Sequence, residues 1–233
     1  MVFWFSILWT LKQIQAMNQT CPLCNHTPSQ DFYQGRLRKY LRCPVCALIF
    51  VAREYLLSPK DERARYDLHE NDPQDPGYRN FLSKLVTPLL EQLGLPPLSG
   101  LDFGSGPGPA LAMMLEEQGY NISLYDPYYA PQPEVLEHTY DFVTCTETME
   151  HFYTPGKEWD ILVKLVKPGG LLGVMTKLID EPEKFPDLHY TKDDTHVSFF
   201  SRRTFSFLAK KDRLAVEFFC DNVVLFSKPE VTK

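Results

Sequence analysis

The order of hydrophobic and polar positions predicts strands alternating with helices over the last two thirds of the chain. Apolar runs that fit buried strands occur at Leu101–Phe103, Ile122–Asp126, Tyr140–Cys145 and Leu171–Thr176. Two further runs, Leu214–Phe219 and Val223–Phe226, are joined at Asp221-Asn222 and fit an antiparallel hairpin. The pattern predicts an α/β fold, a Rossmann-like doubly wound sheet that ends in a C-terminal antiparallel hairpin.

Helical patterns stand between and before these strands. Apolar residues recur at helical spacing from Phe81 to Leu93, and we expect Pro88 to kink this helix and Gly94 to end it. Ser58 predicts the cap of a short helix upstream. After the last parallel strand comes a long insertion, 177–195, followed by a helix with Ser201 as its expected cap.

Three glycines at alternate positions join the first strand to its helix. Glycine lets such a turn bend and lets backbone approach a ligand, and the helix start offers unpaired N–H groups. The stretch predicts cofactor contacts at Asp102, Gly104, Ser105, Gly106 and Gly108. Asp126, about twenty residues further on, is placed to hold ribose hydroxyls of either NAD or S-adenosylmethionine. The alternatives are a bare strand–helix connection and a turn-starting role for Asp126 before Pro127.

Three motifs in order resemble those of class I S-adenosylmethionine-dependent methyltransferases, and most of all the bacterial ubiquinone-biosynthesis-like branch. Leu101–Gly108 resembles their motif I, Tyr140–Pro155 their fourth strand with its loop, and Leu165–Leu172 the turn into their fifth strand. The resemblance implies S-adenosylmethionine as cofactor and a small-molecule methyl acceptor. It does not name the acceptor.

One stretch departs from the family pattern. Asp141 comes only fifteen positions after Asp126, and the stretch between them holds three prolines where the family has a helix and a third strand. We expect the helix to be missing and Glu134–Glu137 to form a rudimentary strand. Tyr128 or Tyr129 is then expected to cover the adenine.

The loop after the fourth strand carries the candidate catalytic groups, because ligands gather at the carboxyl ends of parallel strands. His151 has a pKa range suited to a general base, and it could instead support the loop. Glu147 is a candidate contact to the methionine part of the cofactor or to the acceptor. His189 and His196 are further candidate bases, with a core role open for His196. The insertion that precedes His196 would be a substrate lid or a solvated loop.

By analogy with the family, residues before the first strand reach the cofactor mouth. Tyr66, His69 and Tyr78 are therefore candidate cofactor or acceptor contacts, or else plain linker residues. The sequence shows no second group of metal ligands besides the cysteines, and methyl transfer needs none.

Four cysteines form two Cys-Pro-x-Cys turns separated by eighteen residues. Cys21, Cys24, Cys43 and Cys46 at this spacing predict a tetrahedral structural Zn²⁺ site in a zinc ribbon. Two disulfides or an iron site are the alternatives, and a cytoplasmic location, which we expect, disfavours the disulfides. Cys145 and Cys220 fall in apolar strands and are expected to be inert.

These features divide the chain into a leader of uncertain status (1–16), a zinc ribbon (17–57), a linker with a short helix (58–76) and the methyltransferase domain (77–233). The leader is too short for a membrane helix, and Met17 could be the true start. Residues 17–65 carry a net charge of +4 and the body −11. A basic ribbon that docks RNA is therefore the second hypothesis for function, and a non-catalytic nucleoside-binding module the third.

Overall fold

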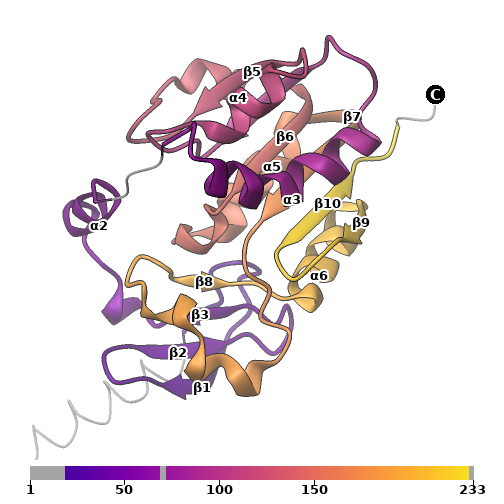
Figure 1. Cartoon of the computed structure of the whole chain (residues 1–233). Helices are drawn as coiled ribbons and strands as arrows, with labels where there is room; N and C mark the ends of the chain where they lie inside the picture. Colours follow the sequence, from indigo (N-terminus) through magenta and orange to yellow (C-terminus); the bar gives the residue numbers. More distant parts are fainter. Residues whose placement is uncertain (1–18, 69–71, 231–233) are drawn as a thin grey trace, which may run out of the picture.

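The structure is a computed structural model that describes residues 19–68 and 72–230 (Figure 1). The leader, the question of Met17 and the candidate contact His69 lie outside the described residues. A six-stranded sheet and a four-stranded sheet organise the described chain. None of the helices in these two ranges combines the length and apolar character that crossing a membrane requires.

The larger sheet has the strand order β5-β4-β6-β7-β10-β9. Its strands are β4 (Ser99–Phe103), β5 (Asn121–Tyr125), β6 (Tyr140–Thr146), β7 (Val166–Met175), β9 (Ala215–Phe218) and β10 (Val223–Ser227). The first four in the chain run parallel, and β10 is antiparallel to both β7 and β9. The predicted fold class, a Rossmann-like sheet with a C-terminal antiparallel hairpin, is confirmed.

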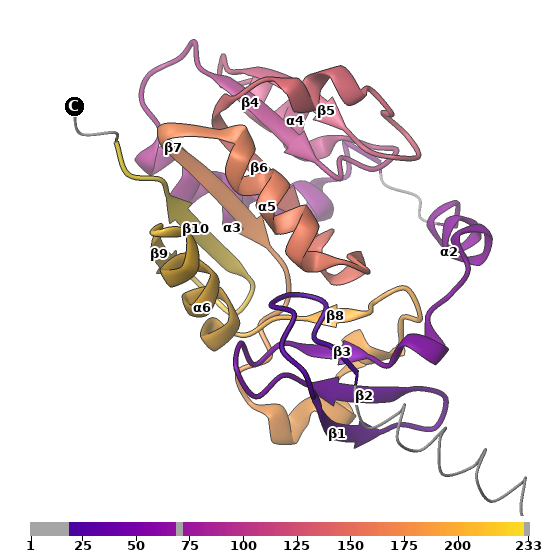
Figure 2. The ribbon, with the colours of Figure 1, turned by 180° about the vertical axis from the view of Figure 1, so that it is seen from behind.

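Helices cover both faces of this sheet, because successive strand residues point to opposite sides. Leu171 and Leu225 pack with α3 (Pro76–Gln92) and α4 (Ala110–Glu116). Leu172 and Phe226 pack with α5 (Pro155–Leu165) and α6 (Arg202–Asp212) on the other face (Figure 2). The sheet is therefore doubly wound.

The smaller sheet joins the N-terminal cysteine region to the insertion. Strands β1 (Gln30–Gln34), β2 (Lys39–Arg42) and β3 (Ile49–Val51) form an antiparallel meander, and β8 (Ser198–Phe199) pairs with β3. The short 3₁₀ helices η4 (Pro182–Asp187) and η5 (His189–Lys192) of the insertion pack beside it (Figure 1). Phe185 of η4 is fully buried against the rings of Tyr40 and Phe199, so the insertion is a packed layer rather than a solvated loop.

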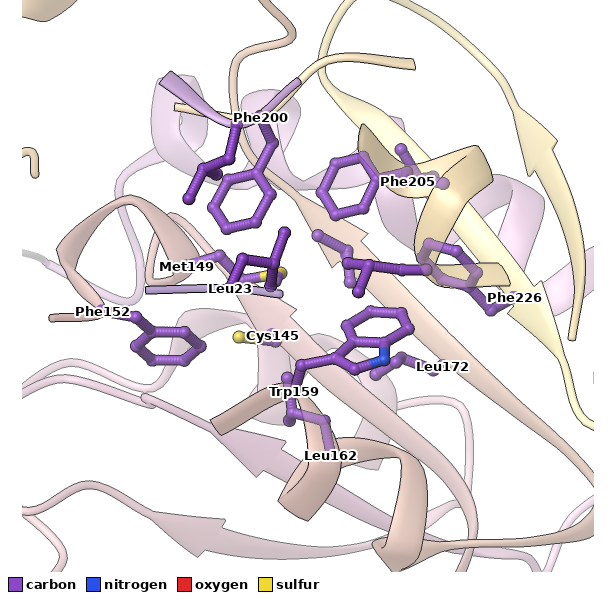
Figure 3. Packing of buried hydrophobic residues seen from close by; sticks show 14 of the residues in the cluster. Leu23, Cys145, Met149, Phe152, Trp159, Leu162, Leu172, Phe200, Phe205 and Phe226 are labelled. Carbon is purple, nitrogen blue, oxygen red and sulfur yellow. The ribbon is translucent and has the colours of Figure 1, made fainter. Parts of the chain in front are cut away.

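One hydrophobic core runs from the cysteine region into the body. Leu23, between two of the cysteines, belongs to the same cluster as Met149, Trp159 and Phe200 (Figure 3). At Gly156 of α5, a Cβ would lie 2.5 Å from the carbonyl oxygen of Leu23. The cysteine region is therefore packed directly onto the body.

One local expectation was wrong. Glu134–Glu137 is not a strand but part of the 3₁₀ helix η2 (Pro133–Glu137), because Pro133 favours a helical first turn. The expected loss of the preceding helix holds, and β5 is the edge of the sheet. α3 continues through Pro88 to Gln92, with Leu93 as its C-cap and Gly94 directly after it, as expected. The kink at Pro88 stays a prediction.

Two expected helix caps hold. Ser58 Oγ accepts a hydrogen bond from the Asp61 N–H at the start of α2 (Pro59–Tyr66). Ser201 Oγ accepts one from the Thr204 N–H at the start of α6. Between β3 and α2 lies a further 3₁₀ turn, η1 (Arg53–Tyr55).

Candidate active site

The glycine turn after β4 is shaped by two left-handed residues. Gly104 has φ +78° and Gly106 has φ +63°, a region that favours glycine. A Cβ on Gly104 would lie 2.3 Å from Thr148 Cγ2, so the loop after β6 can approach only because this residue is glycine. A Cβ on Gly106 would meet no protein atom within 4 Å, because Gly106 faces open space.

Asp126, at the end of β5, ties this turn to the next one. Its Oδ2 accepts the Gly106 N–H at 3.0 Å, and its Oδ1 accepts the N–H groups of Tyr128 and Tyr129 at 2.8 and 3.0 Å. The carboxylate lines the cavity described below and also organises both loops that border it.

Asp102 and Gly108 lie away from the open part of the site. Asp102 is buried in β4 and accepts a hydrogen bond from Thr144 Oγ1 at 2.8 Å. Burial raises the pKa of Asp102 to about 6. Neither residue lines the cavity, and the cofactor contacts expected at Asp102 and Gly108 stay predictions.

A cavity of about 720 Å³ lies at the carboxyl ends of β4, β5 and β6. Gly104, Ser105 and Gly106 line one side, and Glu147, His151 and His196 line another. Ser105 Oγ is buried without a hydrogen-bond partner among the described residues. The volume is ample for a small ligand in a polar, partly aromatic setting.

Two neighbouring glutamates with raised pKa values line the cavity. Glu147 ends β6 with φ +48°, and Glu150 is buried in η3 (Met149–His151). Burial, together with the charge of Glu150, raises the pKa of Glu147 to about 8. Burial also raises the pKa of Glu150, whose Oε2 accepts a hydrogen bond from Thr176 Oγ1. Burial therefore holds both carboxyl groups toward the neutral form, and a cation beside them would favour the ionised form.

The predicted bases His151 and His196 lie together, with ring centroids 4.8 Å apart. His151 Nδ1 donates to the carbonyl oxygen of Thr195 at 3.2 Å, and His196 Nδ1 donates to that of Tyr190 at 2.8 Å. Since a carbonyl only accepts, each neutral ring carries its lone pair on Nε2. Burial lowers the pKa of His196, which favours its neutral form.

The structure also brings together a set that the sequence did not show. One ligand atom from each of Glu150, His151 and His196 lies within 4.8 Å of the others, because η3 and the segment after η5 meet at the cavity. The expectation that the cysteines are the only group of potential metal ligands was therefore wrong, because these three side chains are close enough together to form a second group. The candidate base His189 is exposed on η5 and does not line the cavity.

Aromatic residues close the cavity from the side of α2. Tyr128 Oη donates to Glu62 at 3.4 Å, and Tyr129 Oη donates to Asp67 at 2.9 Å. Tyr66 and Tyr78, two of the candidate contacts, also line the cavity. Sequence reasoning missed Glu62, Asp193 and Tyr153 as lining residues, because polar residues in a linker, an insertion and a loop carry no signal of their own.

The four cysteines form a second site, away from the cavity. The Sγ atoms of Cys21 and Cys46 lie 3.5 Å apart, as do those of Cys24 and Cys43, and all four Sγ atoms lie within 4.8 Å of one another. A disulfide would need about 2.05 Å. Both turns share one backbone form, in which Asn25 N–H bonds the Cys21 carbonyl and Ala47 N–H bonds the Cys43 carbonyl.

The sequence matches the family described as "Methyltransferase domain" over residues 76–215, which is 140 of the 233 residues. The match runs from α3 to the end of α6 and includes the parallel strands and most of the residues that line the cavity. The chain belongs to this methyltransferase family. The resemblance to class I S-adenosylmethionine-dependent methyltransferases is thereby confirmed.

Individual relatives resemble only part of the chain. The ubiquinone biosynthesis O-methyltransferase of Vibrio cholerae is 36% identical over 73 residues, which are 31% of this chain and 30% of that protein. That of Erwinia tasmaniensis is 34% identical over the same shares. The matched region is thus less than a third of the length of these relatives. A structure from Haloferax volcanii, solved as a complex with the Trm112 methyltransferase activator, superposes with a TM-score of 0.52 at 12% identity, covering 76% of this chain and all of that chain.

Proposed function

We propose that this protein transfers a methyl group from S-adenosylmethionine to a small-molecule acceptor in the cavity beside Gly104–Gly106. One observation carries the proposal: a single cavity joins the glycine turn and Asp126 on one side to a pair of imidazole rings on the other. A cofactor site and a proton acceptor therefore face the same space, as methyl transfer to a hydroxyl, amine or carbon acid requires.

The lining residues fit the proposed cofactor. The open space at Gly106 and the unpartnered Ser105 Oγ offer a cradle and a polar contact, and Asp126 offers carboxylate oxygens beside them. When bound, S-adenosylmethionine supplies a methyl group already activated by its sulfonium. The raised pKa values hold the carboxyl groups of Glu147 and Glu150 toward their neutral form, and a sulfonium cation beside them would favour their ionised form.

The imidazole pair supports proton removal from the acceptor. His151 and His196 are each held through Nδ1, so Nε2 is the basic atom of each ring. A proton leaving the acceptor would pass to one of these Nε2 atoms. Alignment of the acceptor against the methyl group supplies the larger share of the rate, since effective molarities of about 10⁵ M are reached by well-oriented groups.

The acceptor is proposed to be neutral or cationic. Six carboxylates line the cavity, and among its described lining residues there is no lysine or arginine; the six are Glu62, Asp126, Glu147, Glu150, Glu158 and Asp193. Such a lining offers phosphate groups no lysine or arginine, so it favours a small molecule over the RNA of the second hypothesis.

For the cysteine cluster we propose a structural Zn²⁺. Four Sγ atoms from two identical turns match the tetrahedral sulfur set that zinc prefers, with Zn–S distances of about 2.3 Å. The domain bounds given above and a cytoplasmic location stay predictions.

Two glycine substitutions test the cofactor site. Gly106 and Gly119 both have positive φ, and at neither does a Cβ clash, but only Gly106 lines the cavity. Alanine at either position carries a similar backbone cost of about 1–2 kcal/mol. We expect Gly106→Ala to weaken S-adenosylhomocysteine binding by about tenfold or more, and Gly119→Ala to leave it within about twofold.

The readout is equilibrium titration, with thermal unfolding of both variants as the control for stability. If both variants bind S-adenosylhomocysteine equally weakly, the loss of affinity reflects lost stability rather than a contact at Gly106. Unchanged binding in Gly106→Ala would remove the glycine turn from the cofactor site.

A further inference from the structure

Arg38, in the turn between β1 and β2, is a buried arginine that reaches across to the insertion. Only 8% of the residue is exposed. Its two terminal nitrogens donate four hydrogen bonds, all to backbone carbonyls of one segment: Nη1 to Asp194 (3.0 Å) and His196 (3.0 Å), and Nη2 to Thr191 (2.6 Å) and Asp193 (2.7 Å).

The charge of Arg38 is held by these carbonyls. In residues 19–68 and 72–230 it forms no ion pair, and its other neighbour of note is the ring of Tyr40, 5.6 Å from Cζ. A buried guanidinium that lost its hydrogen bonds would raise the free energy of the folded state. The four hydrogen bonds therefore fix the positions of the guanidinium and of the four carbonyl groups relative to one another. Lysine could not replace it, because a compact ammonium has three donors and lacks the planar fork.

The same segment orients both imidazoles of the cavity. Arg38 donates hydrogen bonds to the backbone carbonyls of residues 191, 193, 194 and 196. The carbonyls between and beside them, those of Tyr190 and Thr195, accept from His196 Nδ1 and His151 Nδ1. Whatever fixes the path of this backbone therefore fixes the direction of both rings.

We propose that Arg38 is a positioning residue that locks the segment 190–196, so that His151 and His196 are held in the Nδ1–H form with Nε2 as the basic atom. The proposal rests on the proposed function, in which these rings accept the proton of the methyl acceptor. In this proposal a side chain of the cysteine region influences the active site indirectly, through the backbone of residues 190–196, because Arg38 does not line the cavity.

Nuclear magnetic resonance of ¹⁵N-histidine-labelled protein tests this without knowledge of the acceptor. The variants are Arg38→Gln and Arg38→Lys, and the matched control is Arg36→Gln, an exposed arginine of the same turn. Signals are assigned with His151→Gln and His196→Gln. We expect the wild type and the Arg36 variant to show the Nδ1–H pattern at both rings, and both Arg38 variants to lose it.

Amide exchange in the same variants should report the backbone directly. We expect exchange at residues 190–196 to rise by about tenfold or more in both Arg38 variants, with residues 99–108 unchanged. If Arg38→Gln does not fold, Arg38→Lys decides the question. Wild-type ring signals in a folded Arg38 variant, or the same loss in Arg36→Gln, would overturn the proposal.

Titration of S-adenosylhomocysteine separates this proposal from the proposed function. Retained binding in the Arg38 variants, together with altered ring signals, supports a role on the acceptor side. Absence of binding in the wild type would defeat the proposed function, while the ring signals would still decide whether Arg38 positions the histidines.

Discussion

Glu147 shows how single residues set the chemistry of the cavity. It lies at the end of β6 in a left-handed conformation, with its N–H bonded to the Met175 carbonyl at 2.7 Å. This places a carboxyl group beside the buried Glu150, and burial plus that neighbour raises its pKa to about 8. The sequence marked Glu147 as a candidate, but its backbone conformation and its neighbour come from the fold.

The raised pKa of Glu147 predicts a pH dependence of stability. The unfolded chain releases this proton near the ordinary value of 4.5, whereas the folded chain keeps it until about 8. Between those values the unfolded state binds fewer protons, so stability falls as pH rises. We expect the unfolding midpoint of Glu147→Gln to decline less than that of the wild type from about pH 5 to pH 8.

Thermal unfolding across that range measures the effect, and Glu134→Gln, at an exposed position of η2, is the control. The control should follow the wild-type profile. Parallel profiles for wild type and Glu147→Gln would contradict the assigned pKa.

At the scale of elements, the helices and strands that could be predicted are those specified by residues close together in the sequence. Ser58 and Ser201 were identified as helix caps because a cap acts on the next turn, and the strands of the larger sheet follow from their apolar runs. The pairing of β8 with β3 joins residues about 150 positions apart through a two-residue strand, which leaves no pattern to read. The contacts of Arg38 could not be predicted for the same reason, because its partners are backbone carbonyls far away in the sequence.

The shared core predicts how the elements respond to loss of metal. Leu23 and Phe50 of the cysteine region belong to one cluster with Trp159 and Phe205 of the body. We therefore expect chelation, or Cys43→Ser, to lower the midpoint of a single unfolding transition by roughly 10 °C, because structural zinc contributes several kcal/mol to folding. Differential scanning calorimetry with metal analysis of the same samples measures it.

Cys220→Ser is the matched control, a thiol outside the cluster that bonds Asn222 Oδ1 at 3.0 Å. It should leave both the metal content and the midpoint nearly unchanged. A separate low-temperature transition for the cysteine region, with the main transition unmoved, would contradict the shared core.

At the scale of the whole molecule, most basic side chains between residues 17 and 65 form ion pairs or ring contacts within the protein. Lys39 pairs with Asp31 at 2.7 Å and Arg65 with Asp194 at 2.8 Å. Arg42 and Arg63 lie over the rings of Phe32 and Tyr128, and Arg38 is buried. The charge difference predicted from the sequence is real, but five of the eight basic residues are engaged within the described parts of the chain, and none of the eight lines the cavity. This supports a small acceptor.

The central claim is that the cavity at the glycine turn binds S-adenosylmethionine. Isothermal calorimetry of the purified chain against S-adenosylmethionine, S-adenosylhomocysteine and NAD tests it most directly. We predict roughly micromolar binding of both sulfur ligands, each at one site per chain, and no binding of NAD. Binding of NAD alone, or no binding of either sulfur ligand, would contradict it.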